Sequence, residues 1–311
     1  MLVTLKQLLT HANRNSYAVG AFNINNLEIL QAVVEAAAEA KSPIIVQTSE
    51  GAIEYAGSDY LKGMAYIAAK SKIKMAFHLD HGKDLKVIKD CIKNGWTSVM
   101  FDGSKLAYAD NVKKTQTVVG WARQAGVSVE AELGAIKGIE DKVSVREREA
   151  FFTDPAQAVD FVKKTNIDAL AISVGTAHGP FKFEGETVLD FKRIKTIKAL
   201  LKMPLVLHGA SGIPKNVLNI LHEHCAEMND CVRLDHAMGV SDEAIKKAIK
   251  SGINKINIDS DIRIAFTAAV RKTLIEDKGL YDPRKLLTPA KALMKEVALQ
   301  KMKLFGCAGK G

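Results

Sequence analysis

The chain has 311 residues, of which 47% are hydrophobic, enough for one large barrel or for two ordinary domains. It carries 44 basic and 35 acidic residues, but the lysines are spread over predicted helix faces with glutamates between them, and only 6% of the residues are aromatic. The net charge of +9 therefore favours a small anionic substrate over a nucleic acid.

The cysteines and the apolar runs indicate the cellular compartment of the protein. Four cysteines form neither a Cys-x-x-Cys pair nor a dense framework, which is typical of reduced thiols in a cytoplasmic protein. The N-terminal residues lack the features of a signal peptide. No apolar run is long enough to span a membrane, so we expect no membrane partner.

Strand and helix patterns alternate along the whole chain. Short β-branched and apolar runs predict eight strands, at residues 17–22, 44–49, 74–80, 98–102, 127–133, 169–175, 205–208 and 255–259. Helical spacing predicts helices within 4–14, after Asn25-Asn26, within 58–71, 84–94, 108–125, 155–164 and 187–201, two or three within 213–250, one from Ser260, and a final one after Thr288-Pro289. Residues 134–153 form a polar, glycine-containing segment too long for an ordinary βα turn, which is typical of a lid or of a disordered loop.

This alternation predicts an α/β fold, a (β/α)8 TIM barrel. We expect a single domain over residues 1–311, with additional helices at the termini. The competing architecture, a doubly wound open sheet, gathers its site at one switch point, where strands three, six, seven and eight would not obviously meet.

Three predicted strands end in a histidine followed by glycine: His81-Gly82, His178-Gly179 and His208-Gly209. Imidazoles that converge from separate strands suit a zinc site with an open position. In an extended strand Asp80 and His81 would point to opposite faces, but the turn at the strand end relaxes that restriction. The carboxylates of Asp80, Asp102, Glu132 and Asp259 are expected at the same end of the barrel.

Two loops suit a phosphate. Gly209-Ala-Ser-Gly212 follows strand seven, and Asn257-Ile-Asp-Ser260 ends strand eight and begins a helix, the two positions where barrels often bind phosphate. A metal beside a phosphate site suggests chemistry on a phosphorylated carbonyl compound, with zinc as a Lewis acid that stabilises an enolate. An aldolase without metal would need a Schiff-base lysine, and Lys255 begins its strand at the wrong end.

The motifs resemble the class II, zinc-dependent fructose-bisphosphate aldolases over nearly the whole chain. The segments that carry the resemblance are Gly20-Ala-Phe-Asn23, Ser49-Glu-Gly51, His78-Leu-Asp-His-Gly82, Val129-Glu-Ala-Glu-Leu-Gly134, Gly175-Thr-Ala-His-Gly179, Leu207-His-Gly-Ala-Ser211 and Lys255-Ile-Asn-Ile-Asp-Ser-Asp-Ile-Arg263. The resemblance implies a glycolytic and gluconeogenic lyase that reversibly cleaves D-fructose 1,6-bisphosphate to dihydroxyacetone phosphate and D-glyceraldehyde 3-phosphate through a zinc-stabilised enediolate.

The resemblance also implies a role for each matching residue. Zinc would be bound by His81, His178 and His208, Asp80 would exchange the proton of the C4 hydroxyl, and Glu140 would exchange the carbon-bound proton of dihydroxyacetone phosphate. The phosphate of that product would be held by Gly179, Lys182, Gly209, Ser211 and Ser260, its backbone by Asn257 and Asp259, and the other phosphate would lie toward Asn23, Ser49 and Arg263. Asp102 and Glu132 match positions that take a second divalent metal, Na⁺ or K⁺ is implied near Gly179, and a homodimer or homotetramer is implied for the assembly.

Each of these residues has a structural alternative. Asp80 could orient a histidine, and Asp102 and Glu132 could be structural carboxylates of the barrel. Glu140 shares its loop with Glu147 and Glu149, so that its position alone does not single it out. The segment 222–236 contains His222, His224, Cys225, Cys231, Asp235 and His236, but the spacings fit no standard zinc finger, and we interpret it as an exposed connection.

Three other functions compete with this interpretation. Tagatose-1,6-bisphosphate aldolase belongs to the same family, but Asp259 and Arg263 favour fructose bisphosphate. Zinc hydrolases on a barrel commonly place a His-x-His pair on strand one, and residues 17–22 contain none. A non-catalytic phosphosugar or nucleic-acid binder would not need Asp80 together with all three histidines.

Overall fold

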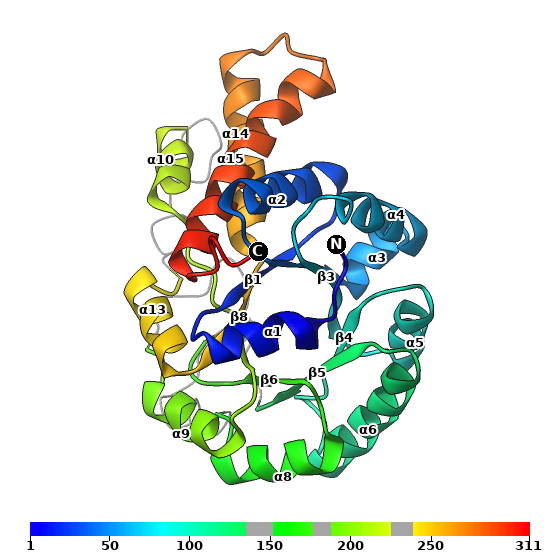
Figure 1. Cartoon of the computed structure of the whole chain (residues 1–311). Helices are drawn as coiled ribbons and strands as arrows, with labels where there is room; N and C mark the ends of the chain where they lie inside the picture. Colours follow the sequence, from blue (N-terminus) through cyan, green and yellow to red (C-terminus); the bar gives the residue numbers. More distant parts are fainter. Residues whose placement is uncertain (135–151, 177–187, 225–238) are drawn as a thin grey trace.

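In the computed structural model, which describes residues 1–134, 152–176, 188–224 and 239–311, eight parallel strands close into a barrel in the order β1 to β8 (Figure 1). The strands are β1 Val19–Asn23, β2 Ile44–Ser49, β3 Met75–Gly82, β4 Ser98–Phe101, β5 Ser128–Leu133, β6 Ala169–Ile172, β7 Leu205–Leu207 and β8 Ile253–Ile258. Residues of β1 pair with both β2 and β8, so the sheet has no free edge. The predicted (β/α)8 barrel is therefore confirmed.

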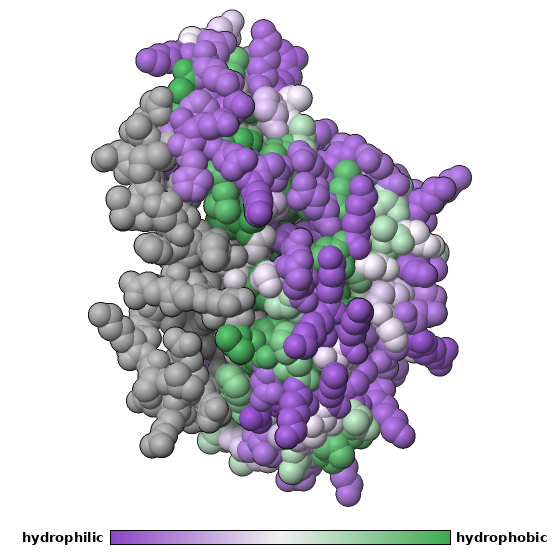
Figure 2. All heavy atoms as spheres, turned by 90° about the vertical axis from the view of Figure 1, so that its left-hand side faces the viewer, coloured by the Kyte–Doolittle hydropathy of each residue, from purple (hydrophilic) through white to green (hydrophobic). Residues whose placement is uncertain are grey.

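Helices surround the barrel and bury one apolar stripe each. In the described residues they are α1 Leu5–Arg14, α2 Leu27–Ala40, α3 Glu50–Ala56, α4 Ser58–Ala68, α5 Leu85–Lys93, α6 Tyr108–Gln124, α8 Pro155–Thr165, α9 Phe191–Leu201, α10 Lys215–Glu223, α13 Asp242–Ser251, α14 Ser260–Glu276 and α15 Pro283–Leu304. Many begin at a side chain that accepts a backbone N–H, as Asn26 does for α2 and Asp154 for α8. On the face shown in Figure 2, hydrophilic side chains cover most of the described surface.

Helix α1 lies across the barrel in the view of Figure 1 and closes the end from which the strands begin. Its buried residues are Leu5, Leu8, Leu9 and Ala12. Thr4 and Gln7 form a capping box at its first turn. The backbone N–H of Lys6 donates to the hydroxyl of Ser128 at 3.1 Å, which ties the helix to the start of β5.

The last two helices form a hairpin that projects beyond the barrel (Figure 1). Helix α15 packs against α14 on one side and α2 on the other. At the contact with α2, Lys291 pairs with Glu35 at 3.0 Å and Lys295 pairs with Glu39 at 2.8 Å. Another face of α15 is buried, so this helix joins the C-terminal part of the chain to the barrel wall.

The start of the final helix was predicted wrongly. Helix α15 begins at Pro283, with Asp282 as its cap, and Pro289 lies inside it instead of at its first position. A proline within the helix leaves one backbone carbonyl without its usual donor. Packing on two neighbouring helices therefore outweighs a local signal that normally marks a helix start.

Smaller differences concern the ends of strands and one short helix. Strand β3 continues to Gly82 and β6 stops at Ile172, whereas the sequence predicts ends at residues 80 and 175. Helix α3 was not predicted; Ser49 caps it by accepting the N–H of Ala52 at 3.2 Å. Among the described residues, no helix combines the length and hydropathy that crossing a membrane requires.

Replacing Leu9 with alanine tests how much α1 contributes to stability. Leu9 is fully buried at the barrel end, and removing such a side chain leaves a cavity. We expect the free energy of unfolding to fall by about 2–5 kcal/mol, measured by denaturant titration. Lys6→Ala, on the exposed side of the same helix, is the control and should change stability far less; equal losses would contradict the packing of α1 described here.

Candidate active site

The turn at the end of β3 brings Asp80 and His81 to the same side. His81 has a φ of 49°, in the left-handed region that non-glycine residues rarely adopt. The pairing of β3 with β4 shifts register between Leu79 and Gly82. At Gly82 a Cβ atom would lie 2.6 Å from the carbonyl oxygen of Met100, so only glycine permits this path. The turn thus allows the adjacent side chains of Asp80 and His81 to point to the same side, which a regular strand would prevent.

Asp80 is held by two amides from other strands. The Nδ2 atoms of Asn23 and Asn257 donate to its two oxygens at 3.0 and 2.9 Å. Burial alone would raise the pKa of Asp80, but the charges of His81 and Lys255 outweigh burial and, with the Asn23 hydrogen bond, lower that pKa to about 2. Asp80 is therefore a fixed, ionised carboxylate.

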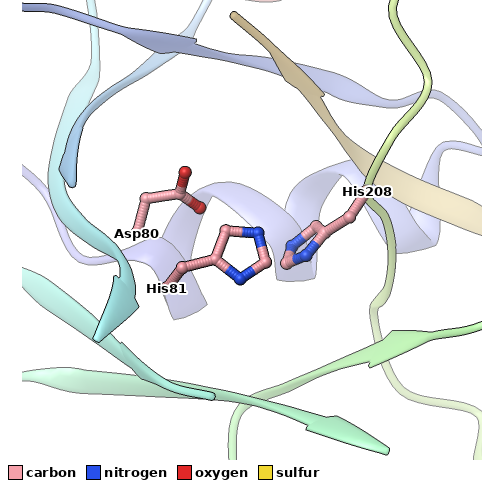
Figure 3. A group of neighbouring side chains, drawn as sticks. All are labelled: Asp80, His81 and His208. Carbon is pink, nitrogen blue, oxygen red and sulfur yellow. The ribbon is translucent and has the colours of Figure 1, made fainter. Parts of the chain in front are cut away.

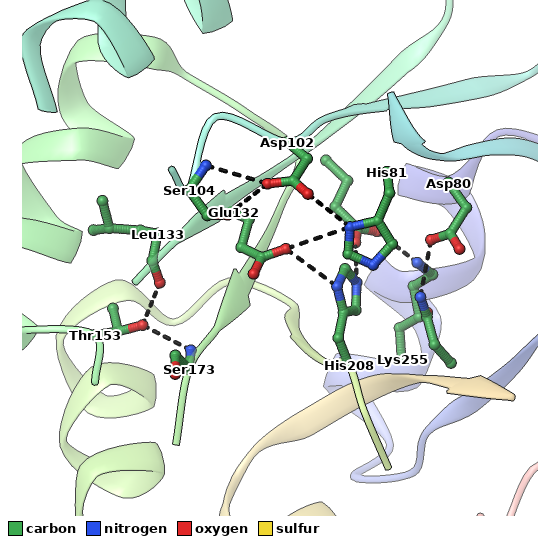
Figure 4. A network of polar contacts seen from close by, with 12 residues as sticks. Asp80, His81, Asp102, Ser104, Glu132, Leu133, Thr153, Ser173, His208 and Lys255 are labelled. Carbon is green, nitrogen blue, oxygen red and sulfur yellow. Dashed lines mark hydrogen bonds and ion pairs between the residues drawn. The ribbon is translucent and has the colours of Figure 1, made fainter. Parts of the chain in front are cut away.

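His81 faces two further carboxylates (Figure 4). Its Nδ1 donates to Asp102 Oδ2 at 2.9 Å and lies 3.8 Å from Glu132 Oε2. Burial lowers the pKa of His81, yet the charge of Asp80 and the bond to Asp102 raise it overall. Asp102 in turn accepts the hydroxyl of Ser104 at 2.7 Å, which fixes the carboxylate.

His208, at the end of β7, is anchored by a carboxylate deeper in the barrel. Its Nε2 donates to Glu130 Oε1 at 2.9 Å, and its Nδ1 lies 3.3 Å from Glu132 Oε2. Burial would lower the pKa of His208, but these two glutamates raise it to about 10. A metal ligand must be a neutral imidazole, so metal binding to His208 would displace a proton.

Glu130 is itself neutralised by a buried lysine. Its Oε2 pairs with Lys255 Nζ at 2.9 Å, and both side chains are fully buried. Burial raises the pKa of Glu130, but Lys255 and His208 lower it more strongly, so Glu130 is ionised. His78 lies beside them, with its Nε2 3.6 Å from Glu130 and its Nδ1 2.7 Å from the Ser98 hydroxyl. This chain of contacts orients His208.

The side chains at the barrel end fit a divalent metal. One set of ligand atoms within 4.8 Å of one another belongs to Asp80, His81 and His208 (Figure 3). A second set belongs to His81, Asp102 and Glu132 and shares His81 with the first. Mixed imidazole and carboxylate donors are those that zinc takes in catalytic sites. Behind the first set, Asp102 holds His81 and Glu130 holds His208, which is the outer support that such ligands need.

The predicted phosphate loops lie at the ends of β7 and β8. Gly209 has a φ of 63°, and the carbonyl of Ser211 accepts the N–H of Val240 at 3.2 Å. Ser260 is the first residue of α14, where free backbone N–H groups favour an anion. Asp259 precedes it and pairs with Arg263 at 2.6 Å; burial raises the pKa of Asp259.

The structure brings together many, though not all, of the predicted site residues. Asp80, His81, Asp102, Glu132, His208, Asn23 and Asn257 are in mutual contact or in the metal-ligand sets. Asn257 was predicted to contact substrate, and here its amide donates to Asp80. Four predicted residues lie outside the described part of the chain: Glu140, His178, Gly179 and Lys182. Of the segment 222–236, residues 225–236 also lie outside it.

Sequence reasoning missed Glu130 and misjudged the importance of Lys255. A signal was present, because each is a charged residue inside a predicted strand of a buried sheet, where charged side chains are rare unless they are paired. Glu130 and Glu132 are also two residues apart, which places both side chains on the same face of β5.

Glu130→Gln tests whether the buried carboxylate supports a metal ligand. The amide keeps the shape but loses the charge that holds the His208 ring, and changes in such supporting partners cost about 10–100-fold in metal affinity. We expect Zn²⁺ affinity, measured by competition with a chelating dye, to fall within that range. Glu39→Gln, on the surface of α2, is the control. An unchanged affinity in folded Glu130→Gln would contradict the role of Glu130.

Comparisons with known proteins agree with this geometry. The family model described as "Fructose-bisphosphate aldolase class-II" matches residues 3–310. A fructose-bisphosphate aldolase of Helicobacter pylori is 45% identical over 312 residues, and one of Thermus caldophilus is 43% identical over 310, each covering 100% of both chains. The crystal structure of the YdjI aldolase from Escherichia coli K12 has a TM-score of 0.80 at 32% identity, over 100% of this chain and 99% of that one. The chain belongs to the class II fructose-bisphosphate aldolase family.

Proposed function

We propose that this protein is a zinc-dependent aldolase that reversibly cleaves D-fructose 1,6-bisphosphate to dihydroxyacetone phosphate and D-glyceraldehyde 3-phosphate. The observation that carries the proposal is the convergence of Asp80, His81 and His208 at the barrel end, beside two loops suited to phosphate. The Helicobacter and Thermus relatives are named fructose-bisphosphate aldolases, which supports the same substrate. We propose a cytoplasmic homodimer or homotetramer.

Zinc would be held by His81 and His208 together with His178. When bound, it would act as a Lewis acid that polarises the substrate carbonyl. Asp102 bonds to the Nδ1 atom of His81 and Glu132 lies near the same atom, and these two carboxylates would accept a second divalent metal. Na⁺ or K⁺ near Gly179 belongs to the same proposal.

Asp80 would take the proton of the C4 hydroxyl. As that proton leaves, the C3–C4 bond breaks, its electron pair stays with the dihydroxyacetone phosphate half, and the C4 oxygen becomes the aldehyde oxygen. Glu140 would then return a proton to the C3 carbon. The two amides on Asp80 support this role because they fix the carboxylate, while the charges of His81 and Lys255 keep it ionised and thus able to accept a proton.

The remaining predicted residues would position the two phosphates. Gly209, Ser211 and Ser260 surround the ends of β7 and β8, and with Gly179 and Lys182 they would bind the phosphate of dihydroxyacetone phosphate, with Asp259 and Asn257 along its backbone. Asn23, Ser49 and Arg263 would lie toward the other phosphate. Because Arg263 already pairs with Asp259, binding of that phosphate would compete with an existing ion pair.

Metal removal tests the zinc requirement. Purified protein should carry about one tightly bound zinc per chain in this catalytic site. We expect chelation to abolish cleavage of fructose 1,6-bisphosphate in a coupled assay and added zinc to restore it, with tagatose 1,6-bisphosphate as the comparison substrate. Full activity in a metal-free preparation, a lysine adduct trapped by borohydride, or a preference for the tagatose substrate would each contradict the proposal.

Asp80→Asn tests the proton transfer separately from metal binding. The amide keeps the shape but cannot accept the proton, so cleavage should lose about 3–5 kcal/mol of transition-state stabilisation. The variant should still bind zinc and exchange tritium between water and the carbon of dihydroxyacetone phosphate, because that exchange is assigned to Glu140. His81→Ala, the comparison, should lose zinc and both activities together. An equal collapse of exchange and cleavage in zinc-loaded Asp80→Asn would reject the separate role.

A further inference from the structure

Both backbone polar groups of Gly212 are held by a buried ion pair. Asp261 Oδ1 accepts the N–H of Gly212 at 3.1 Å, and Lys301 Nζ donates to its carbonyl at 2.6 Å. Lys301 and Asp261 also pair with each other at 2.9 Å, with side chains that are 7% and 0% exposed. Burying such a pair costs desolvation free energy, and here both members of the pair hydrogen-bond to the backbone of the same glycine.

This pair joins the two halves of the predicted phosphate site. Gly212 lies in the loop that follows β7, one residue after Ser211. Asp261 is the second residue of α14, directly after Ser260. The carboxylate of Asp261 therefore connects the loop after β7 to the first turn of α14. Lys301 binds both this carboxylate and the carbonyl of Gly212.

The opposite side of the loop is closed by backbone contacts. A Cβ atom at Gly212 would lie 2.5 Å from the carbonyl oxygen of Val240, and one at Gly239 would clash with the carbonyl oxygen of Ser211. The two backbones are therefore in close contact, so that residues 239–240 support the loop on this side while Lys301 and Asp261 hold it on the other.

Lys301 differs from the other ion-paired lysines of its helix. Lys291 and Lys295 face surface glutamates and remain about one third exposed, whereas Lys301 is turned inward. A cavity of about 410 Å³, lined in part by Gly212, Gln300 and Lys301, adjoins it. That space would accommodate the larger guanidinium of an arginine.

We propose that Lys301 is a positioning residue for phosphate binding: through Asp261 and Gly212 it sets the spacing between the β7 loop and the start of α14. The inference rests on the proposed function for its substrate, dihydroxyacetone phosphate. It adds to the site a residue from the last helix, remote from the reacting atoms.

Lys301→Met tests the proposal in the zinc-loaded, full-length protein. A misplaced binding group costs up to about 100-fold, so we expect the KM for dihydroxyacetone phosphate in the condensation reaction to rise about 10-fold, with kcat changed less than about 3-fold. The dissociation constant of inorganic phosphate, measured by calorimetry, should rise by a similar factor. Zinc content should not change.

Three variants make the outcome decisive. Lys301→Arg should restore most of the phosphate affinity, and Lys295→Met removes a surface pair of the same helix without effect. Where Lys301→Met does not fold, the double change Lys301→Met with Asp261→Asn leaves no buried unpaired charge and should show the same raised KM. A KM and phosphate affinity within twofold of wild type in the folded variant, or no rescue by arginine, would overturn the proposal. A wild-type protein that binds phosphate without cleaving fructose 1,6-bisphosphate would instead refute the proposed function.

Discussion

The site depends on the charge of Glu130 deep inside the barrel. A carboxylate without solvent is tolerated only when it is paired and hydrogen-bonded. Lys255 from β8 supplies the opposite charge, and His208 from β7 supplies a donor. These contacts fix the His208 ring, and Glu132 then lies between His208 and His81. The barrel end that carries Asp80, His81 and His208 is thus built on a polar layer below it, which explains why Glu130 and Lys255 occupy the buried strands β5 and β8.

Much of the fold could be predicted from the sequence, because each strand and helix carries its own periodicity and cap. The convergence of Asp80, His81 and His208 followed from one rule, that residues at the ends of parallel strands meet. The contacts of Glu130 could not be predicted in this way, since they depend on which interior side chains from β5, β7 and β8 reach the same depth. Pro289 shows the opposite failure, a strong local signal overruled by packing on neighbouring helices.

The turn at His81 shows how a strained residue serves a site. Backbone conformations with positive φ cost free energy for a histidine and persist only when neighbours enforce them. Here the close approach of Gly82 to Met100 and the bond to Asp102 do so. The result is that two adjacent residues present a carboxylate and an imidazole to one small volume.

The pairing of the first strand with the last affects how the protein acquires its site during synthesis. Val19 pairs with Lys255, so the sheet closes only after most of the chain has left the ribosome. Lys255 is also the counter-charge of Glu130, which means that a partly synthesised barrel holds a carboxylate without its lysine. Such an intermediate must keep its centre hydrated. Expulsion of water, burial of the charges and convergence of His81 and His208 should therefore occur in one late, cooperative step, slow because its contacts are distant in sequence.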